Sequence, residues 1–198
     1  LFRKAGYQTI HIGKAHFAPK DREGENPLNL GFDVNVAGTC FGAPGSYYGT
    51  RSFGVGSKNL HARPVPHLEK YHGQNIFLTE ALTLEAKAEI DKALNASKPF
   101  FLHMSHYAVH SPFQSDARFA KNYQGKSASL MAYATMIEGM DKSLGDLIDH
   151  IETKGVAENT LIIFLGDNGG DAPDKDLDGI SSCAPLRGRK GAQWEGGM

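Results

Sequence analysis

Apolar residues recur along the chain with two different spacings, and each spacing predicts one kind of element. In residues 78–94 and 127–154 they recur every three or four positions, which places them on one face of an amphipathic helix. Short apolar runs at 7–12, 100–105 and 160–165 are typical of buried strands. Because strands and helices alternate, the pattern predicts an α/β fold, with a mostly parallel sheet and helices covering both of its faces.

The stretches before and between these elements predict a turn and a long loop. Residues 1–5 have the pattern of a last helical turn, and Gly6 is suited to end it, because glycine readily adopts the left-handed conformation of a helix C-cap. Residues 38–56 are rich in glycine and predict an irregular loop. Its aromatic residues support two interpretations, a wall on which a sugar ring stacks or side chains that pack the loop down: Phe41, Tyr47, Tyr48 and Phe53.

Composition says little about the fold, but it narrows the kinds of binding partner. A chain of 198 residues, 40% hydrophobic and 22% charged, is ordinary for one globular domain or part of a larger one. Its net charge of -1 gives no electrostatic basis for binding nucleic acid, and no apolar run approaches the ~20 residues of a membrane span. Leu1 is not a start residue, so we expect the true N-terminus and any targeting signal to lie upstream.

Three polar clusters each begin where an apolar run ends. They are GKAH at 13–16, HYAVHSP at 106–112 and GDNGG at 166–170. In open α/β sheets, ligands bind beyond the carboxyl ends of the strands, and parallel strands bring those ends to one edge. The sequence therefore predicts a single site built from all three clusters.

The first two clusters also have a purely structural interpretation. Lys14 and His16 are compatible with an ordinary loop. His106 and His110 are compatible with a solvated pair, although Pro112 argues against a helix there. The convergence of the clusters at one edge favours the functional interpretation over the structural one.

The remaining clusters add a hard donor pair and a basic loop. Asp167 and Asn168 precede a glycine, as in many tight turns, but their carboxylate and amide oxygens also suit Ca²⁺ or Mg²⁺. Residues 185–191, PLRGRKG, form either a basic surface loop or an anion-binding loop around Lys190. Lysines for an anion, a hard cation for its charge and a histidine to protonate the leaving oxygen together suit a tetrahedral oxyanion ester.

Longer motifs extend this interpretation over the whole chain. They are AGYQT with IGKAH, GFD, PFFL with VHSP, a helical segment with a central Met-Asp pair, NTLIIFLGDNG and PLRGRKGAQWEGG, at residues 5–16, 31–33, 99–112, 133–145, 159–169 and 185–197. In this order they resemble the calcium-dependent, formylglycine-type sulfatase family. The resemblance implies the alkaline phosphatase-like fold. It also implies that residues 1–198 are part of one sulfatase catalytic domain, with the nucleophile segment and the C-terminal remainder outside them.

The resemblance implies a role for each basic residue that matches a family motif. Lys14 and Lys190 correspond to the two lysines that bind the sulfate group. His16 corresponds to the histidine that contacts the formylglycine nucleophile. His110 corresponds to the histidine that binds sulfate and protonates the departing alcohol.

The resemblance also implies a calcium site that is only half present. Asp167 and Asn168 match two ligands of one Ca²⁺ ion, whereas two further aspartates and the formylglycine are expected upstream of residue 1. Cys183 begins a segment, CAPLR, that fits the C-x-P-x-R pattern of the formylglycine precursor, but it belongs to the motif that ends at Lys190 and comes too late in the chain. His106 has no counterpart in the family and serves either a substrate hydroxyl or the fold.

The family implies a sulfuric ester hydrolase that cleaves sulfate monoesters, with a sulfated small molecule or glycan as substrate and a periplasmic, secreted or lysosomal location. A phosphatase or phosphonate monoester hydrolase of the same superfamily is the alternative, because phosphate and sulfate esters share a tetrahedral geometry. Lys14 and Lys190 favour sulfate, since two-metal phosphatases require more Asp and His ligands. A third possibility is a catalytically incompetent remnant that binds carbohydrate. We expect the 198-residue chain alone to be inactive.

Overall fold

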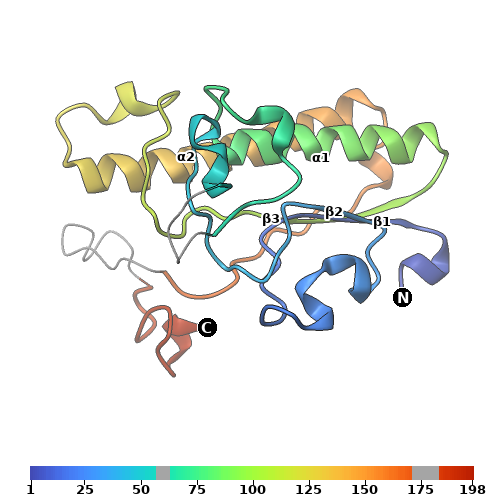
Figure 1. Ribbon diagram of the computed structural model, residues 1–198, viewed down its shortest axis with the longest axis horizontal. Helices are drawn as coiled ribbons and strands as arrows, with labels where there is room; N and C mark the ends of the chain where they lie inside the picture. Colours follow the sequence, from blue (N-terminus) through green and yellow to red (C-terminus); the bar gives the residue numbers. More distant parts are fainter. Residues whose placement is uncertain (57–62, 171–182) are drawn as a thin grey trace.

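The fold is built on a small parallel sheet. The computed structural model describes three ranges of the sequence: 1–56, 63–170 and 183–198. Its strands run parallel in the order β2-β1-β3 (Figure 1), with the bounds β1 (Gln8–Gly13), β2 (Val34–Val36) and β3 (Phe100–Ser105). Ile10 of the central strand pairs with Val34 on one side and with Leu102 on the other. The predicted α/β class with a parallel sheet is confirmed.

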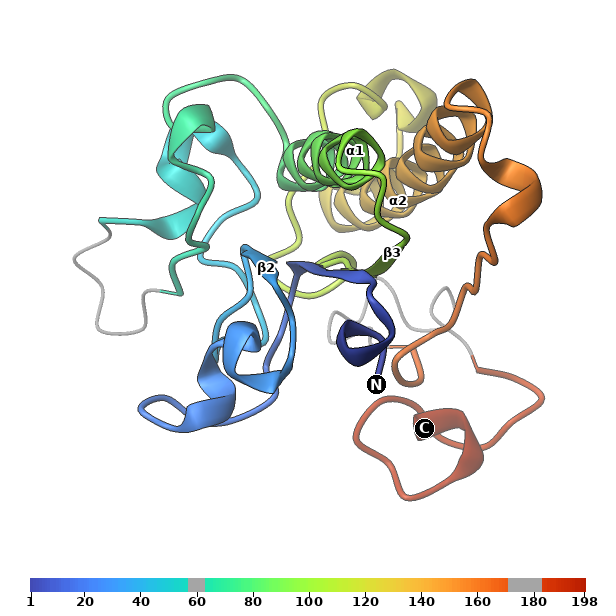
Figure 2. The ribbon, with the colours of Figure 1, turned by 90° about the vertical axis from the view of Figure 1, so that its right-hand side faces the viewer.

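The two α-helices lie on the same side of this sheet (Figure 2). Helix α1 (Leu78–Asn95) packs against β1 and β3, and α2 (Ala128–Thr153) packs against α1. The Ser127 hydroxyl caps α2 by accepting a hydrogen bond from the Leu130 amide at 3.2 Å. Both helices match the predicted segments. The prediction that helices cover both faces is wrong for the described residues, because turns and loops occupy the second face.

The other described helical segments are short 3₁₀ turns. Gly6 follows the first of them with a φ of 87°, as predicted for a residue that ends a helical turn. None of the helices in the described ranges is long and apolar enough to cross a membrane. The bounds of the turns are η1 (Arg3–Ala5), η2 (Glu23–Glu25), η3 (Pro27–Leu30), η4 (Gly49–Gly54), η5 (Glu69–Tyr71), η6 (Ala120–Tyr123), η7 (Ala157–Asn159) and η9 (Glu195–Gly197).

The main core fills the space between the sheet and α1. Ile10 and Ile12 of β1 belong to one buried cluster with Leu82 and Ile90 of α1, and all four side chains are fully buried. Burial of a side chain of this size contributes roughly 1.5–3 kcal/mol. These positions are the apolar residues of the predicted strand and helix, so packing follows the periodicity of the sequence.

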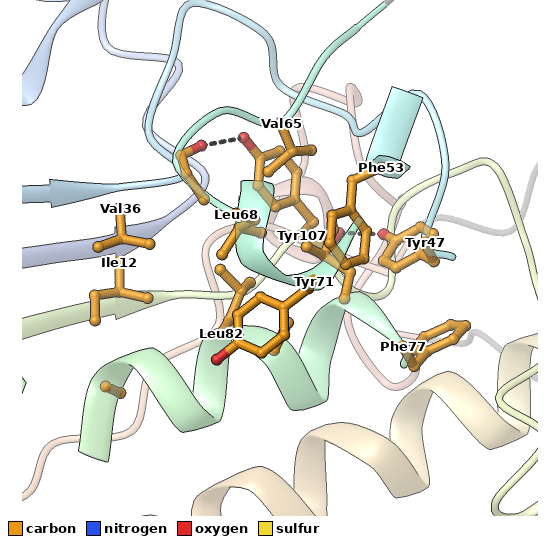
Figure 3. Packing of buried hydrophobic residues seen from close by; sticks show 14 of the residues in the cluster. Ile12, Val36, Tyr47, Phe53, Val65, Leu68, Tyr71, Phe77, Leu82 and Tyr107 are labelled. Carbon is orange, nitrogen blue, oxygen red and sulfur yellow. Dashed lines mark hydrogen bonds between the residues drawn. The ribbon is translucent and has the colours of Figure 1, made fainter. Parts of the chain in front are cut away.

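The loop over residues 38–56 is irregular, as predicted, but it is also part of the core (Figure 3). Tyr47 and Phe53 are fully buried, while Phe41 and Tyr48 are half-buried. The packing interpretation is therefore confirmed for Tyr47 and Phe53, and a sugar-stacking role for these two rings is wrong.

The third predicted strand, residues 160–165, is wrong in this structure. The segment has no strand assignment, and Leu161, Phe164 and Leu165 are 84%, 73% and 80% exposed. A strand is stabilised by hydrogen bonds to a neighbouring strand, and in the described residues β3 pairs with β1 alone. An apolar sequence marks where a strand can be buried, but it does not supply the partner.

The second face of the sheet carries a pair of histidines. His11 and His103 are partners in the β1–β3 register, and their Nδ1 atoms lie 3.1 Å apart. The Nε2 atom of His11 lies 3.2 Å from the Gly13 carbonyl oxygen, which only accepts hydrogen bonds, so the proton of His11 is on Nε2 and its Nδ1 accepts from His103. Burial and the neighbouring His103 lower the pKa of His11 to about 4, and burial lowers the pKa of His103.

We expect acid to destabilise the full-length protein through this pair. The neutral pair makes its full contribution to the free energy of unfolding above about pH 6.5, where a histidine in the unfolded chain is also neutral. This contribution is lost as the pH falls towards about 4, because the unfolded chain binds the proton at a higher pH than the folded one. By about pH 5 the loss from His11 is roughly 2 kcal/mol. The midpoint of thermal unfolding should therefore drop between about pH 7.5 and 5.

The double variant His11→Gln/His103→Gln should show a smaller drop, whereas replacing the exposed His67 by Gln serves as the control. An unchanged drop in the double variant would rule out this source of acid sensitivity.

Candidate active site

The first cluster follows β1 and lies directly beside the end of β3. A Cβ atom on Gly13 would come within 1.9 Å of the Ser105 carbonyl oxygen, and Gly13 has a φ of 102°, so only glycine fits here. The Lys14 amide then donates to the same Ser105 oxygen at 2.7 Å. These contacts place the Lys14 side chain, which is 18% exposed, at the carboxyl edge of the sheet.

Lys14 also connects the first cluster with the third. Its Nζ atom lies 3.6 Å from Oδ2 of Asp167, whose side chain is 74% exposed. An exposed ion pair of this length stabilises the fold by less than about 1 kcal/mol, so its significance is geometric. It places an ammonium group and a carboxylate from distant parts of the sequence at the same point, although residues 160–165, which precede Asp167, do not form the predicted strand.

His16 is held by the loop that follows β2. Its φ of 54° lies in the left-handed region, and its amide donates to the Thr39 carbonyl at 2.9 Å. Its ring packs against Gly42, where a Cβ atom would approach the imidazole Nδ1 to 2.6 Å. Gly42 thus leaves the space that the imidazole occupies.

His110 sits in a turn after β3. Its amide donates to the Tyr107 carbonyl at 3.0 Å, and its Nδ1 lies 3.0 Å from the Ser111 carbonyl oxygen. Because that oxygen can only accept, Nδ1 carries the proton in the neutral ring, and Nε2 is the nitrogen that gains or loses a proton. This tautomer is compatible with a general acid that acts through Nε2.

The ring of His106, in contrast, lies mostly out of the solvent: the residue is half-buried and its Nδ1 atom is fully buried. Its Nδ1 atom has no hydrogen-bond partner within the described residues, and burial lowers the pKa of the imidazole to about 4. His106 is therefore neutral near pH 7 and unsuited to donate a proton there. The interpretation of His106 and His110 as a solvated pair is wrong for His106.

The C-terminal basic loop docks on the segment that contains Asp167 and Asn168. The Lys190 amide donates to the Gly170 carbonyl at 3.1 Å, and the Gly170 amide donates to Sγ of Cys183 at 3.2 Å. Gly169 lies so close to the Gly196 carbonyl that a Cβ atom at position 169 would clash with it. Lys190 is thereby brought, through its backbone, to the turn that follows Asn168.

Two further residues of this loop have structural contacts. The Arg187 guanidinium lies over the Trp194 ring, 3.8 Å from its centroid. Cys183 is half-buried and its sulfur accepts a hydrogen bond from the Gly170 amide, so it is part of the contact between the basic loop and the turn after Asn168.

Direct contacts join the first cluster to the third and the third to the basic loop, whereas the turn of His110 is connected through the loop after β2. Lys14 contacts the end of β3 and Asp167, and the Lys190 amide binds Gly170. The loop after β2 contacts His16 and, through Tyr47, the turn of His110. Sequence reasoning considered this loop as a sugar-stacking wall, but it did not predict that the loop holds the backbone around His16 and His110. Its only signal was a cluster of glycines and aromatics between two predicted elements.

The oxygen donors present fit a hard cation in kind, but they supply only part of a coordination shell. Asp167 offers a carboxylate and Asn168 an amide oxygen, whereas Ca²⁺ takes six to eight oxygens. Over 1–56, 63–170 and 183–198 no group of three or more His, Cys, Asp or Glu side chains is arranged to hold a metal ion. A calcium site here therefore requires ligands in addition to these two.

Comparison with known proteins places this arrangement in a family. The protein-family model described as Sulfatase matches residues 1–198. Arylsulfatase J of Mus musculus is 31% identical over 201 residues, which cover 99% of this chain and 32% of that protein. N-acetylgalactosamine-6-sulfatase of Homo sapiens is 26% identical over 208 residues, which cover 100% of this chain and 37% of that protein.

Solved structures give the same result. The crystal structure of Ps i-CgsB in complex with k-i-k-neocarrahexaose is 29% identical to this chain, has a TM-score of 0.79, and covers 99% of this chain and 44% of that chain. PsFucS1 sulfatase from Pseudoalteromonas sp. is 27% identical with a TM-score of 0.67. The chain spans less than half the length of these relatives.

Proposed function

The chain belongs to the sulfatase family, and from this premise we propose that the full-length protein hydrolyses sulfate monoesters. The observation that carries the proposal is the contact between Lys14 and Asp167 at the edge of the sheet. An ammonium group and a hard oxygen donor at one point suit a tetrahedral oxyanion ester, whose negative charge both a lysine and a divalent cation stabilise.

The basic residues have distinct roles in this proposal. Lys14 and Lys190 bind the sulfate oxygens as compact positive charges. His110 donates the proton from Nε2 to the leaving alcohol oxygen, so that the alcohol departs neutral. His16 would contact the nucleophile, and its amide is bound by the same loop that reaches the turn of His110.

Two groups outside the described residues complete the chemistry. Formylglycine, formed upstream of residue 1, supplies the nucleophile for sulfur. Asp167 and Asn168 would hold Ca²⁺ together with ligands from the same upstream segment, and the ion would supply positive charge near the sulfate group. On this view residues 1–198 are part of one catalytic domain and inactive alone.

A sulfated glycan is the proposed substrate class. N-acetylgalactosamine-6-sulfatase acts, by its name, on a sulfated sugar, and Ps i-CgsB was crystallised with a neocarrahexaose.

The test is to produce the full-length protein with a formylglycine-generating enzyme and to assay it with Ca²⁺ against an aryl sulfate and the matching aryl phosphate. We expect hydrolysis of the sulfate and little of the phosphate. We expect no turnover from the 198-residue chain, with or without Cys183→Ala. Preference for the phosphate would contradict the proposed function, and turnover that depends on Cys183 would contradict the upstream position of the nucleophile.

A further inference from the structure

A buried tyrosine connects the loop after β2 to the turn that carries His110. The phenolic oxygen of Tyr47 lies 2.7 Å from the Tyr107 carbonyl oxygen and 2.8 Å from the His110 carbonyl oxygen. The His110 amide donates to the same Tyr107 oxygen at 3.0 Å and closes the turn. The Tyr47 hydroxyl therefore contacts both ends of this turn, and a dashed line in Figure 3 marks its hydrogen bond to Tyr107.

Tyr47 is itself fixed in place from several sides. It is fully buried, and its ring stacks on Phe77 with centroids 5.3 Å apart. Its amide donates to the Gln114 side chain at 2.6 Å, and its carbonyl accepts from the Leu78 amide, at the start of α1, at 2.8 Å. The hydroxyl is thus held against the turn by α1 and by the segment that follows His110.

This arrangement bears on the direction of the His110 ring. The ring is oriented by the contact of its Nδ1 with the Ser111 carbonyl, and that carbonyl follows directly on the His110 carbonyl that Tyr47 contacts. A change in the turn would move the Ser111 carbonyl, and with it the hydrogen bond that determines the His110 tautomer and the direction of its Nε2 atom. Catalytic groups lose effectiveness steeply when they are misplaced by even about 1 Å.

We propose that Tyr47 is a positioning residue for His110, acting through its hydroxyl on the backbone of the turn. The proposal rests on the proposed function, because it gives His110 the role of general acid. The loop of Tyr47 also binds the His16 amide at Thr39 and leaves space for the His16 ring at Gly42. One loop therefore sets the placement of both histidines.

The structure offers a matched control. Tyr107 belongs to the turn through its backbone, but its buried hydroxyl donates to the Ala37 carbonyl at 2.7 Å and not to a carbonyl of the turn. Tyr47→Phe and Tyr107→Phe each delete one buried hydroxyl and should lower the thermal unfolding midpoint to a similar extent.

The experiment measures kcat of the two variants in the full-length protein on a sugar sulfate, which needs the acid, and on an activated aryl sulfate, which needs it little. Tyr47→Phe should lower kcat on the sugar sulfate about 10-fold and on the aryl sulfate less than about 2-fold. Tyr107→Phe should affect both substrates equally. His110→Ala, assayed in parallel, tests the underlying function separately.

The outcomes are distinguishable. If His110→Ala shows no preference between the substrates, the acid assignment of the proposed function fails and the positioning role fails with it. If His110→Ala is selective but Tyr47→Phe lowers both activities equally, or Tyr107→Phe is as selective as Tyr47→Phe, only the positioning role is overturned. Selective loss confined to Tyr47→Phe and His110→Ala supports it.

Discussion

Replacing His110 by alanine in the full-length protein should lower kcat on a sugar or alkyl sulfate by about 10²–10⁴-fold, and on an activated aryl sulfate far less. The reason is the stability of the departing oxygen. A sugar alkoxide is strongly basic and needs a proton as the S–O bond breaks, whereas an aryl oxide with electron-withdrawing groups leaves without one. The tautomer that we infer from the distance between Nδ1 and the Ser111 carbonyl oxygen has its proton on Nδ1 and leaves Nε2 to carry the proton for the leaving group.

A series of aryl sulfates with graded leaving groups measures this prediction. The logarithm of kcat should depend more steeply on the pKa of the leaving phenol in His110→Ala than in the parent enzyme. His106→Gln is the control, because burial lowers the pKa of that imidazole to about 4 and makes it unsuited to donate the proton. Parallel slopes for His110→Ala and the parent would contradict the role of His110 as the acid.

Local periodicity was sufficient to predict the elements that bury their own apolar faces. β1, β3, α1 and α2 all appear within about two residues of their predicted positions, because their apolar residues meet one another in the core. The segment 160–165 has an equally apolar sequence and yet forms no strand among the described residues. The difference is that a strand depends on a backbone partner, which the pattern within the segment cannot provide.

The positions of strand ends and of local motifs were sufficient to predict where part of the site lies. Lys14 and Asp167 were expected at one edge of the sheet, and their ion pair joins them there. The roles of Lys14, Lys190, His16 and His110 remain predictions that mutagenesis must test. The contact of Tyr47 with the His110 turn was not predicted. It consists of a hydroxyl group bound to backbone carbonyls about 60 residues away in the sequence, and no spacing pattern indicates such a contact.

Replacing Lys14 by alanine should lower kcat/KM for sulfate esters by at least about 10²-fold, and Lys190→Ala should have a similar effect. Each removes a positive charge that we assign to the sulfate oxygens, in a site where Lys14 is mostly shielded from water. Charge-assisted contacts in such sites are strong because their donors are already oriented. Lys14→Arg should restore the activity only in part, since the planar guanidinium presents its donors in a different geometry.

Calcium titration separates this effect from a loss of the metal. Lys14 places its ammonium group 3.6 Å from Oδ2 of Asp167, so removing it leaves that carboxylate with less competition for a cation. Lys14→Ala should therefore bind Ca²⁺ at least as tightly as the parent enzyme while its kcat/KM stays low at saturating Ca²⁺. The exposed Lys121, replaced by alanine, is the control for a general change in charge. If excess Ca²⁺ restores full activity to Lys14→Ala, the lysine supports the metal site rather than the sulfate, and its assignment as an anion ligand is wrong.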